Sequence, residues 1–189
     1  MRRSFRSLPL LLGVISLASG CGYNRLQTLD EQVNKAEGEI KVQLQRRSDL
    51  IGNLVETVKG AARQESTVFI GVAEARARLN GAVQSGSLQQ MGEANAALAA
   101  PLSRLIATVE AYPDLKSSAN FIQLQDQLEG TENRIAVART DYNGSVEQFN
   151  ASIRKFPTVI TAKMFGLGKP REYFEVTTPG AEAAPKVNF

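Results

Sequence analysis

Few residues of this chain can do covalent or metal chemistry. The 189 residues contain no His and one Cys, Cys21. Without His there is no imidazole acid, base or metal ligand, and one Cys forms neither an intrachain disulfide nor a cysteine metal cluster. We therefore expect no cofactor and no metal. The remaining candidates are the Cys21 thiol, which can be alkylated, and a set of polar side chains at helical spacing.

These polar side chains fall in two segments of the chain. The first segment holds Arg46, Arg47, Asp49, Asn53 and Glu56, and the second holds Glu132, Arg139, Tyr142 and Asn143. Steps of three, four and seven residues place most members of each segment on one helix face. If the two segments pack as antiparallel helices, Arg47 or Asp49 pairs with Arg139 or Glu132.

This polar set has three interpretations. It is a network that sets the register of packed helices, a surface that binds a partner protein, or a carboxylate site that supplies an acid and a base. The catalytic interpretation lacks a Gly-rich phosphate loop and a metal-ligand cluster. Carboxylate di-metal sites in helical bundles use Glu-x-x-His, which a chain without His cannot form. We therefore predict no enzyme, and the first two interpretations stay open.

The net charge is concentrated at the N-terminus. The chain has 22 basic and 19 acidic residues, a net charge of +3 and a pI of about 9.1. Arg2, Arg3 and Arg6 are the only charged residues among the first twenty, so the remainder has 22 − 3 = 19 basic against 19 acidic residues. A balanced chain has no basic footprint for nucleic acid, and we expect no nucleic-acid partner.

Residues 1–20 have the layout of a secretory signal. Basic residues precede an apolar run from Leu8 to Leu17, and small residues follow. The run is shorter than the roughly 20 residues that a membrane span needs. It ends in Leu17-Ala18-Ser19-Gly20-Cys21, which resembles a bacterial lipobox, with Ala18 where Leu is commoner. There the Cys thiol receives diacylglycerol and the signal is cut off before it.

The lipobox predicts a chain held on a bacterial membrane by acyl chains such as palmitate, facing away from the cytoplasm. Each buried CH₂ contributes about 0.8 kcal/mol, so two or three chains anchor firmly. Gly22, and not Asp, follows the Cys, which favours the outer membrane where the source has two membranes. A chance Cys after an ordinary signal and an uncleaved N-terminal anchor are the alternatives.

The rest of the chain predicts long helices. From Asn24 to about Asn80 there is no proline, and apolar residues recur at steps of three and four. One helix is expected there, with bends near its glycines, which each cost about 1 kcal/mol. Residues 80–100 are predicted to be a linker. A second helix is expected to begin near Pro101, or to kink there, and to end at Tyr112, and Asp114 is expected to cap the next helix.

The third helical segment has the most regular spacing. Its apolar residues Leu128, Ile135, Tyr142, Phe149 and Phe156 lie seven apart, which favours left-handed supercoiling against partner helices. A short helix is expected from Thr158 to Phe165. The tail, residues 166–189, is predicted to be extended or flexible, with Phe174, Val187 and Phe189 available to dock.

Together these segments predict an all-α fold. We expect an antiparallel, coiled-coil-like bundle of three to four long helices over residues 21–165, with a non-helical C-terminal tail. A coiled coil between chains, and hence a homo-oligomer, is the alternative.

Two segments and the tail carry a family resemblance. Val42 to Gly60 reads VQLQRRSDLIGNLVETVKG, Tyr112 to Lys116 reads YPDLK, and Glu129 to Ile135 reads EGTENRI. Together with Tyr23-Asn24, Ala138-Arg139, Asp141-Tyr142-Asn143, Asn150, Phe156-Pro157, Tyr173-Phe174 and the final PKVNF, they resemble the LemA family.

The resemblance implies an all-α bundle tethered to a bacterial membrane by its N-terminus. Many members have a membrane-spanning N-terminal helix, which a lipid anchor replaces here. The family has no settled biochemical activity and is loosely associated with membrane proteases and envelope maintenance. We therefore expect a lipid-anchored scaffold or adaptor for envelope proteins. A self-assembling structural envelope protein is the alternative, and an enzyme with a carboxylate site is a distant third.

Lipidation gives the first testable prediction. Cys21→Ser removes the thiol that the lipobox chemistry needs, so the precursor stays uncleaved or the chain becomes soluble. Membrane fractionation with immunoblotting measures both outcomes. A Cys21→Ser chain found in membranes at the normal mature size contradicts the lipobox interpretation.

Overall fold

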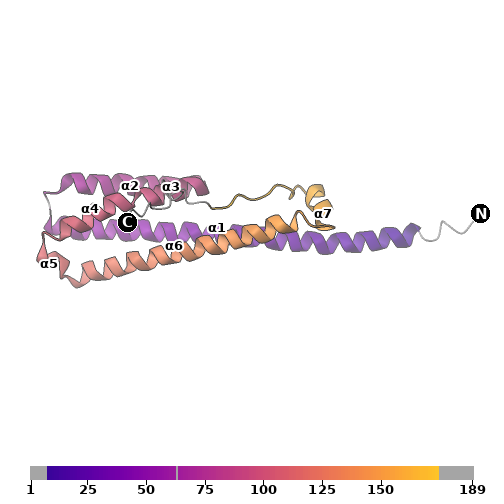
Figure 1. Cartoon of the computed structure of the whole chain (residues 1–189), viewed down its shortest axis with the longest axis horizontal. Helices are drawn as coiled ribbons and strands as arrows, with labels where there is room; N and C mark the ends of the chain where they lie inside the picture. Colours follow the sequence, from indigo (N-terminus) through magenta and orange to yellow (C-terminus); the bar gives the residue numbers. More distant parts are fainter. Residues whose placement is uncertain (1–7, 63, 175–189) are drawn as a thin grey trace, which may run out of the picture. The chain divides into compact units, whose positions relative to one another are not determined.

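The computed structural model describes residues 8–62 and 64–174, with side chains from Gly22 onward. This part of the chain is all-helical and contains no strand. Its helices are α1 (Leu8–Ala61), α2 (Ser66–Ser85), α3 (Leu88–Ala97), α4 (Ala99–Val109), α5 (Pro113–Lys116), α6 (Ala119–Ser152) and α7 (Thr158–Met164) (Figure 1). The all-α prediction is confirmed. None of the helices in these residues is long and apolar enough to cross a membrane.

The chain divides into two compact units. The first comprises Met1–Gly38 and Thr140–Tyr173, and the second Glu39–Arg139 and Phe174–Phe189. Helices α1 and α6 each contribute to both units. Of the predicted signal segment, residues 8–20 have a helical backbone that continues into the rest of α1, and residues 1–7 lie outside the described residues.

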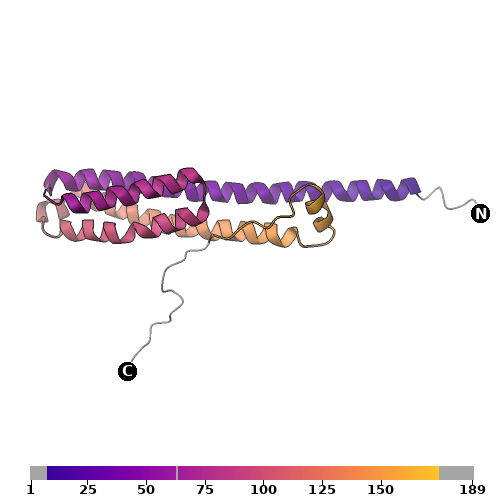
Figure 2. The same ribbon diagram turned by 90° about the horizontal axis from the view of Figure 1, so that it is seen from above.

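The core of the second unit follows the predicted apolar seam. Ile40, Leu44, Ile51, Leu54 and Val58 of α1 are at most 1% exposed. Burying one such side chain contributes about 1.5–3 kcal/mol, which offsets the cost of glycines in α1. Helix α2 contacts both α3 and α4, and Figures 1 and 2 show it beside them.

The prediction of a single helix over residues 24–80 is wrong, because α1 ends at Ala61 and a new helix, α2, begins at Ser66. The apolar seam is weakest here, where Arg63, Gln64 and Glu65 follow Ala61 and Ala62 in the sequence. Helix α2 has its own buried row, Phe69, Val72, Ala75, Leu79 and Ala82. A break lets both apolar rows be buried within one unit, which a continuous helix would prevent.

The predicted linker over residues 80–100 is mostly helical instead. Helix α2 continues through Gly81 to Ser85 and ends at Gly86, whose φ of 73° is left-handed. The Ser87 hydroxyl then accepts a hydrogen bond from the Gln90 backbone N–H and caps α3. Buried Met91 and Leu98 give this segment an apolar side, so it packs as a helix.

The short helices are partly as predicted. Pro101 lies in the first turn of α4, and α7 forms where a small helix was expected. Asp114 does not cap α6; it lies in α5, and the Ser118 hydroxyl accepts from the Phe121 N–H instead. Phe156 does not belong to the buried row of apolar residues spaced seven apart on α6, because α6 ends at Ser152 and Phe156 is 82% exposed.

In the first unit, the buried side-chain amide of Asn150 holds the segment after α7 in place through two hydrogen bonds. The Asn150 side chain, which is 6% exposed, accepts from the Arg171 N–H (2.8 Å) and donates to the Arg171 carbonyl (2.9 Å). The Arg171 guanidinium donates to Asp30 of α1 (2.8 Å). Phe174, one of the three tail residues available to dock, is assigned to the second unit and is buried, whereas Val187 and Phe189 lie outside the described residues.

This amide gives the second prediction. Asn150→Ala leaves the Arg171 N–H and C=O without their partner, and each buried unsatisfied group costs about 1–3 kcal/mol. We expect the free energy of unfolding to fall by about 2 kcal/mol in urea denaturation of the full chain in mild detergent. Asn133→Ala, at an exposed position of the same helix, is the matched control and should be near neutral. Equal stabilities of the two variants would contradict the role of Asn150.

Candidate functional site

The second unit contains a groove of about 610 Å³ lined by residues of α1, α3, α4 and α6. Its apolar wall is made by Leu54, Leu102, Ile106, Phe121 and Leu128. Helical spacing explains the wall, because Leu102 and Ile106 are four residues apart on α4, and Phe121 and Leu128 are seven apart on α6. Most of these side chains belong to the apolar rows that build the core.

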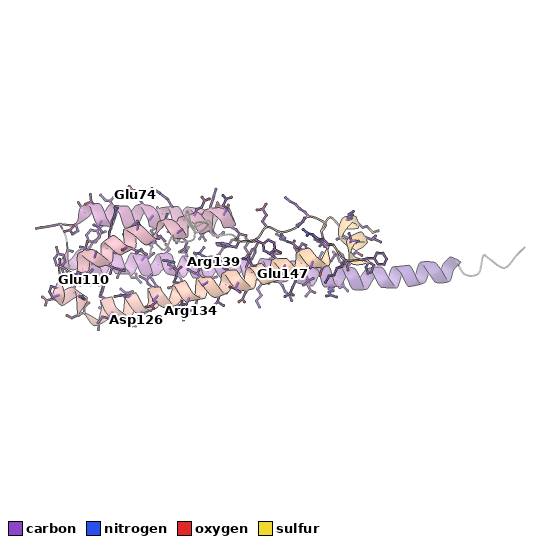
Figure 3. The ribbon with its side chains drawn as sticks, viewed as in Figure 1. Glu74, Glu110, Asp126, Arg134, Arg139 and Glu147 are labelled. Atoms are coloured by element: carbon purple, nitrogen blue, oxygen red, sulfur yellow. The ribbon has the colours of Figure 1, made fainter. Side chains whose placement is uncertain are left out.

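One wall of the groove carries the predicted charged residues. Arg47 of α1 forms an ion pair with Glu132 of α6. Arg139, labelled in Figure 3, lies on α6 as well and also lines the groove. The Arg47 side chain is 12% exposed, and that of Glu132 is 49% exposed. The structure therefore brings Arg47, Glu132 and Arg139 into one wall. Glu129 also lines the groove, at an exposed position.

Burial and like charge act on both guanidinium groups. Burial lowers the pKa of Arg47, and the positive charge of Arg139 lowers it further. Burial also lowers the pKa of Arg139. An arginine stays charged despite such shifts, so the groove holds two partly desolvated cations. Arg139 lies over the Phe174 ring at 5.0 Å from its centroid, a cation–π contact.

Three buried polar atoms of groove residues have neither a hydrogen-bond partner nor an ion-pair partner among the described residues. They are Nε of Arg47, Nε of Arg139 and Oδ1 of Asn95, whose residue is 5% exposed. Buried polar groups are hydrogen-bonded in most proteins, and each exception costs free energy. The groove therefore combines an apolar wall with two guanidinium donors, which suit a carboxylate or carbonyl oxygen, and one amide oxygen that can accept a hydrogen bond.

The other predicted residues of α1 lie away from this wall. Asp49 is an exposed residue 3.9 Å from the Arg76 guanidinium of α2, and it accepts a hydrogen bond from Gln45. Arg46 and Asn53 are exposed on α1. None of the three lines the groove.

Tyr142 and Asn143 belong to the first unit, so the predicted polar set is divided. Tyr142 is 2% exposed and donates its hydroxyl proton to the Glu172 carbonyl (2.9 Å). Burial raises the pKa of Tyr142 to about 12, and the charge of Glu37 adds to this shift. The phenol thus stays a donor at neutral pH. Asn143 is half-buried.

Three residues missed by the sequence analysis hold α2 against α1. The Arg76 Nε donates to the fully buried Ser48 hydroxyl (3.2 Å). A Cβ at Gly52 would lie 2.8 Å from the Arg76 guanidinium, so the glycine allows this close approach. Small residues four apart on one helix face, Ser48 and Gly52, are a signal that could have indicated it. Asn95 was also missed, because its segment was taken for a linker.

Over residues 8–62 and 64–174 there is no group of three or more His, Cys, Asp or Glu side chains that could hold a metal ion. The arrangement instead suits binding, because apolar surface and cationic donors face the same groove.

The fold and the groove define an all-helical protein with arginines in the wall of an apolar groove. The LemA family model matches residues 36–189. Magnetosome proteins MamQ 1 and MamQ 2 of Paramagnetospirillum magneticum are each 30% identical to the chain, over 84% of this chain and 66% of theirs. MamQ of Magnetospirillum gryphiswaldense is 29% identical, over 95% of this chain and 76% of its own. The chain belongs to the LemA family.

The charged wall gives the third prediction. Glu132→Ala removes the carboxylate that pairs with a buried guanidinium, and we expect unfolding free energy to fall by about 1–3 kcal/mol. In an Arg47→Met background the same change should cost at least about 1 kcal/mol less, because the buried charge is gone. Denaturant titration of the four chains of this double-mutant cycle measures the coupling.

The control for this cycle is the exposed pair of Lys59 and Glu56, whose atoms are 3.1 Å apart. Glu56→Ala should cost less than about 0.5 kcal/mol. A coupling energy of zero between Arg47 and Glu132 would contradict the ion pair.

Proposed function

We propose that the chain is a lipid-anchored, extracytoplasmic protein of the bacterial envelope that acts as a non-catalytic adaptor. In this proposal the groove of the second unit holds an apolar segment of a partner protein. The observation that carries it is the pair of partly buried arginines with unpartnered Nε atoms beside an apolar wall. A partner segment with apolar side chains and a carboxylate or carbonyl oxygen would satisfy both features.

Other observations support the membrane anchor and the adaptor role. The lipobox-like end at Cys21 supports acyl anchoring, and the family resemblance suggests envelope proteins, such as membrane proteases, as partners. The relatives are named as magnetosome proteins, which is compatible with a role in an assembly at a membrane. The chain spans 66% of the length of two of them, so their roles are carried over only as part of this proposal.

An antiparallel bundle is the architecture proposed for the second unit. Along α1, Lys41 lies beside Gly86 and Asp49 lies beside Arg76. As the residue numbers increase along α1, those of the neighbouring residues on α2 decrease. This order supports antiparallel packing of the two helices across the four-residue connection from Ala62 to Glu65.

The fourth prediction tests the groove directly. A photo-crosslinking amino acid in place of Ile106, which lines the groove, should give an adduct of defined mass with an envelope protein in intact cells. The same amino acid at Ile122, which is 48% exposed on α6 and does not line the groove, is the matched control. Arg139→Met should lower the Ile106 adduct at least about tenfold, since losing one partner of a desolvated charged contact costs over about 1.4 kcal/mol.

Identical adducts at both positions would contradict the groove as a binding site. An adduct of twice the chain mass, together with a stable homo-oligomer in light scattering, would favour the self-assembling structural protein instead.

A further inference from the structure

Helix α7 and its flanks expose large apolar side chains in the first unit. Phe156 is 82% exposed, Met164 72%, Ile160 55% and Phe165 53%. Single exposed apolar residues are normal on protein surfaces, but these four lie within ten residues of chain. Ile160 and Met164 are four apart and share one face of α7, whereas Ala162 is fully buried. The helix therefore presents an apolar face outward.

Positive charge accompanies this apolar face. Arg154, Lys155, Lys163 and Lys169 are all exposed, and no Asp or Glu occurs between residues 148 and 171. The rest of the chain after residue 20 compensates for this excess, because the total is balanced. Exposed apolar residues interleaved with Lys and Arg are typical of segments that lie in the interface of an anionic membrane. We call these four apolar and four cationic residues the α7 surface.

The α7 surface lies at the end of the first unit that leads to Cys21. The Phe165 ring packs on the Tyr23 ring, with centroids 4.6 Å apart. A Cβ at Gly22 would lie 3.4 Å from the Thr161 hydroxyl oxygen, so α7 passes close to the residue that follows Cys21. Figure 2 shows α7 beside α1 in this unit. A membrane that holds acyl chains at Cys21 would meet α7 first.

We propose that the α7 surface binds anionic phospholipid headgroups of the membrane to which the chain is tethered. The four apolar side chains enter the interfacial layer, and the four cationic side chains contact lipid phosphates, with their aliphatic stems along the apolar surface. The location rests on the proposed tether at Cys21, whereas the lipid class rests on the charges of this surface.

The absence of Trp from the chain allows a local test. Ile160→Trp in the full chain is reconstituted in phosphatidylglycerol vesicles with brominated acyl chains, which quench tryptophan in contact with lipid. Quenching several times stronger than for Val137→Trp, an apolar position of similar exposure (60%), is the expected result. Equal quenching at the two positions, or none at position 160, overturns the proposal.

Charge reversal tests the lipid class. In the Ile160→Trp chain, Lys155→Glu with Lys163→Glu should largely abolish quenching, because each cation near an anionic surface is worth about fivefold in the docking equilibrium. Lys35→Glu with Arg104→Glu, two exposed cations outside the α7 surface, is the matched control. Quenching that is equally strong in phosphatidylcholine vesicles overturns the anionic lipid as ligand.

Vesicle flotation of the Ile160→Trp chain separates this proposal from the tether. A chain that floats with vesicles while the introduced tryptophan stays unquenched keeps the tether and overturns the α7 surface. If the chain also carries Cys21→Ser and still floats with its tryptophan quenched, the result supports the α7 surface and contradicts the acyl tether. If the tryptophan is shielded from solvent only after membrane proteins are added, the result overturns the lipid proposal in favour of a protein partner.

Discussion

The second unit depends on how two guanidinium groups are accommodated in an apolar interior. Arg47 is nearly buried and lies close enough to Arg139 for the two charges to disfavour each other. A buried charge without a partner is strongly destabilising, so Glu132 of α6 has to face Arg47 of α1. A one-residue slide of α6 turns its side chains by about 100° and would break this pair. We propose that the ion pair selects one register, and it still leaves both Nε atoms without partners at the groove. Setting register and binding a partner are thus compatible roles of the same residues.

The parts of the fold that local sequence determines could be predicted. Apolar periodicity predicted the helices, and the prolines correctly placed the start of α4 and the small helix α7. The break after Ala61 and the helix α3 depended on a different property, namely which apolar rows face each other. The apolar series runs from Val58 and Ala61 to Val68 and Val72 with only Glu65 interrupting it, and this spacing is the same whether the chain continues straight or reverses. The buried stripe was extended to Phe156 for the same reason, since spacing does not reveal that α6 has already ended.

The candidate site was predictable to the extent that helix faces identify neighbours. The spacing left open whether Arg47 or Asp49 pairs with Arg139 or Glu132, and the structure pairs Arg47 with Glu132. Tyr142 was grouped with Arg139 although the two are assigned to different units, because periodicity gives the face of a residue and not the unit that buries it. Arg76 and Asn95 carry no periodic signal. Their roles come from contacts across helices that were predicted to be one helix or a linker.

Charge balance conceals two local concentrations of positive charge. The +3 total resides in the first six residues, and the balanced remainder suggested a surface without electrostatic preference. Yet residues 148–171 contain only basic charge, and the groove wall holds two arginines. Salt affects these features differently. Exposed cations at an anionic surface are screened over about 10 Å at about 0.1 M salt, whereas buried pairs are screened much less and acyl burial involves no charge. Raised salt would thus release the α7 surface first, and leave the Arg47–Glu132 pair and an acyl tether in place.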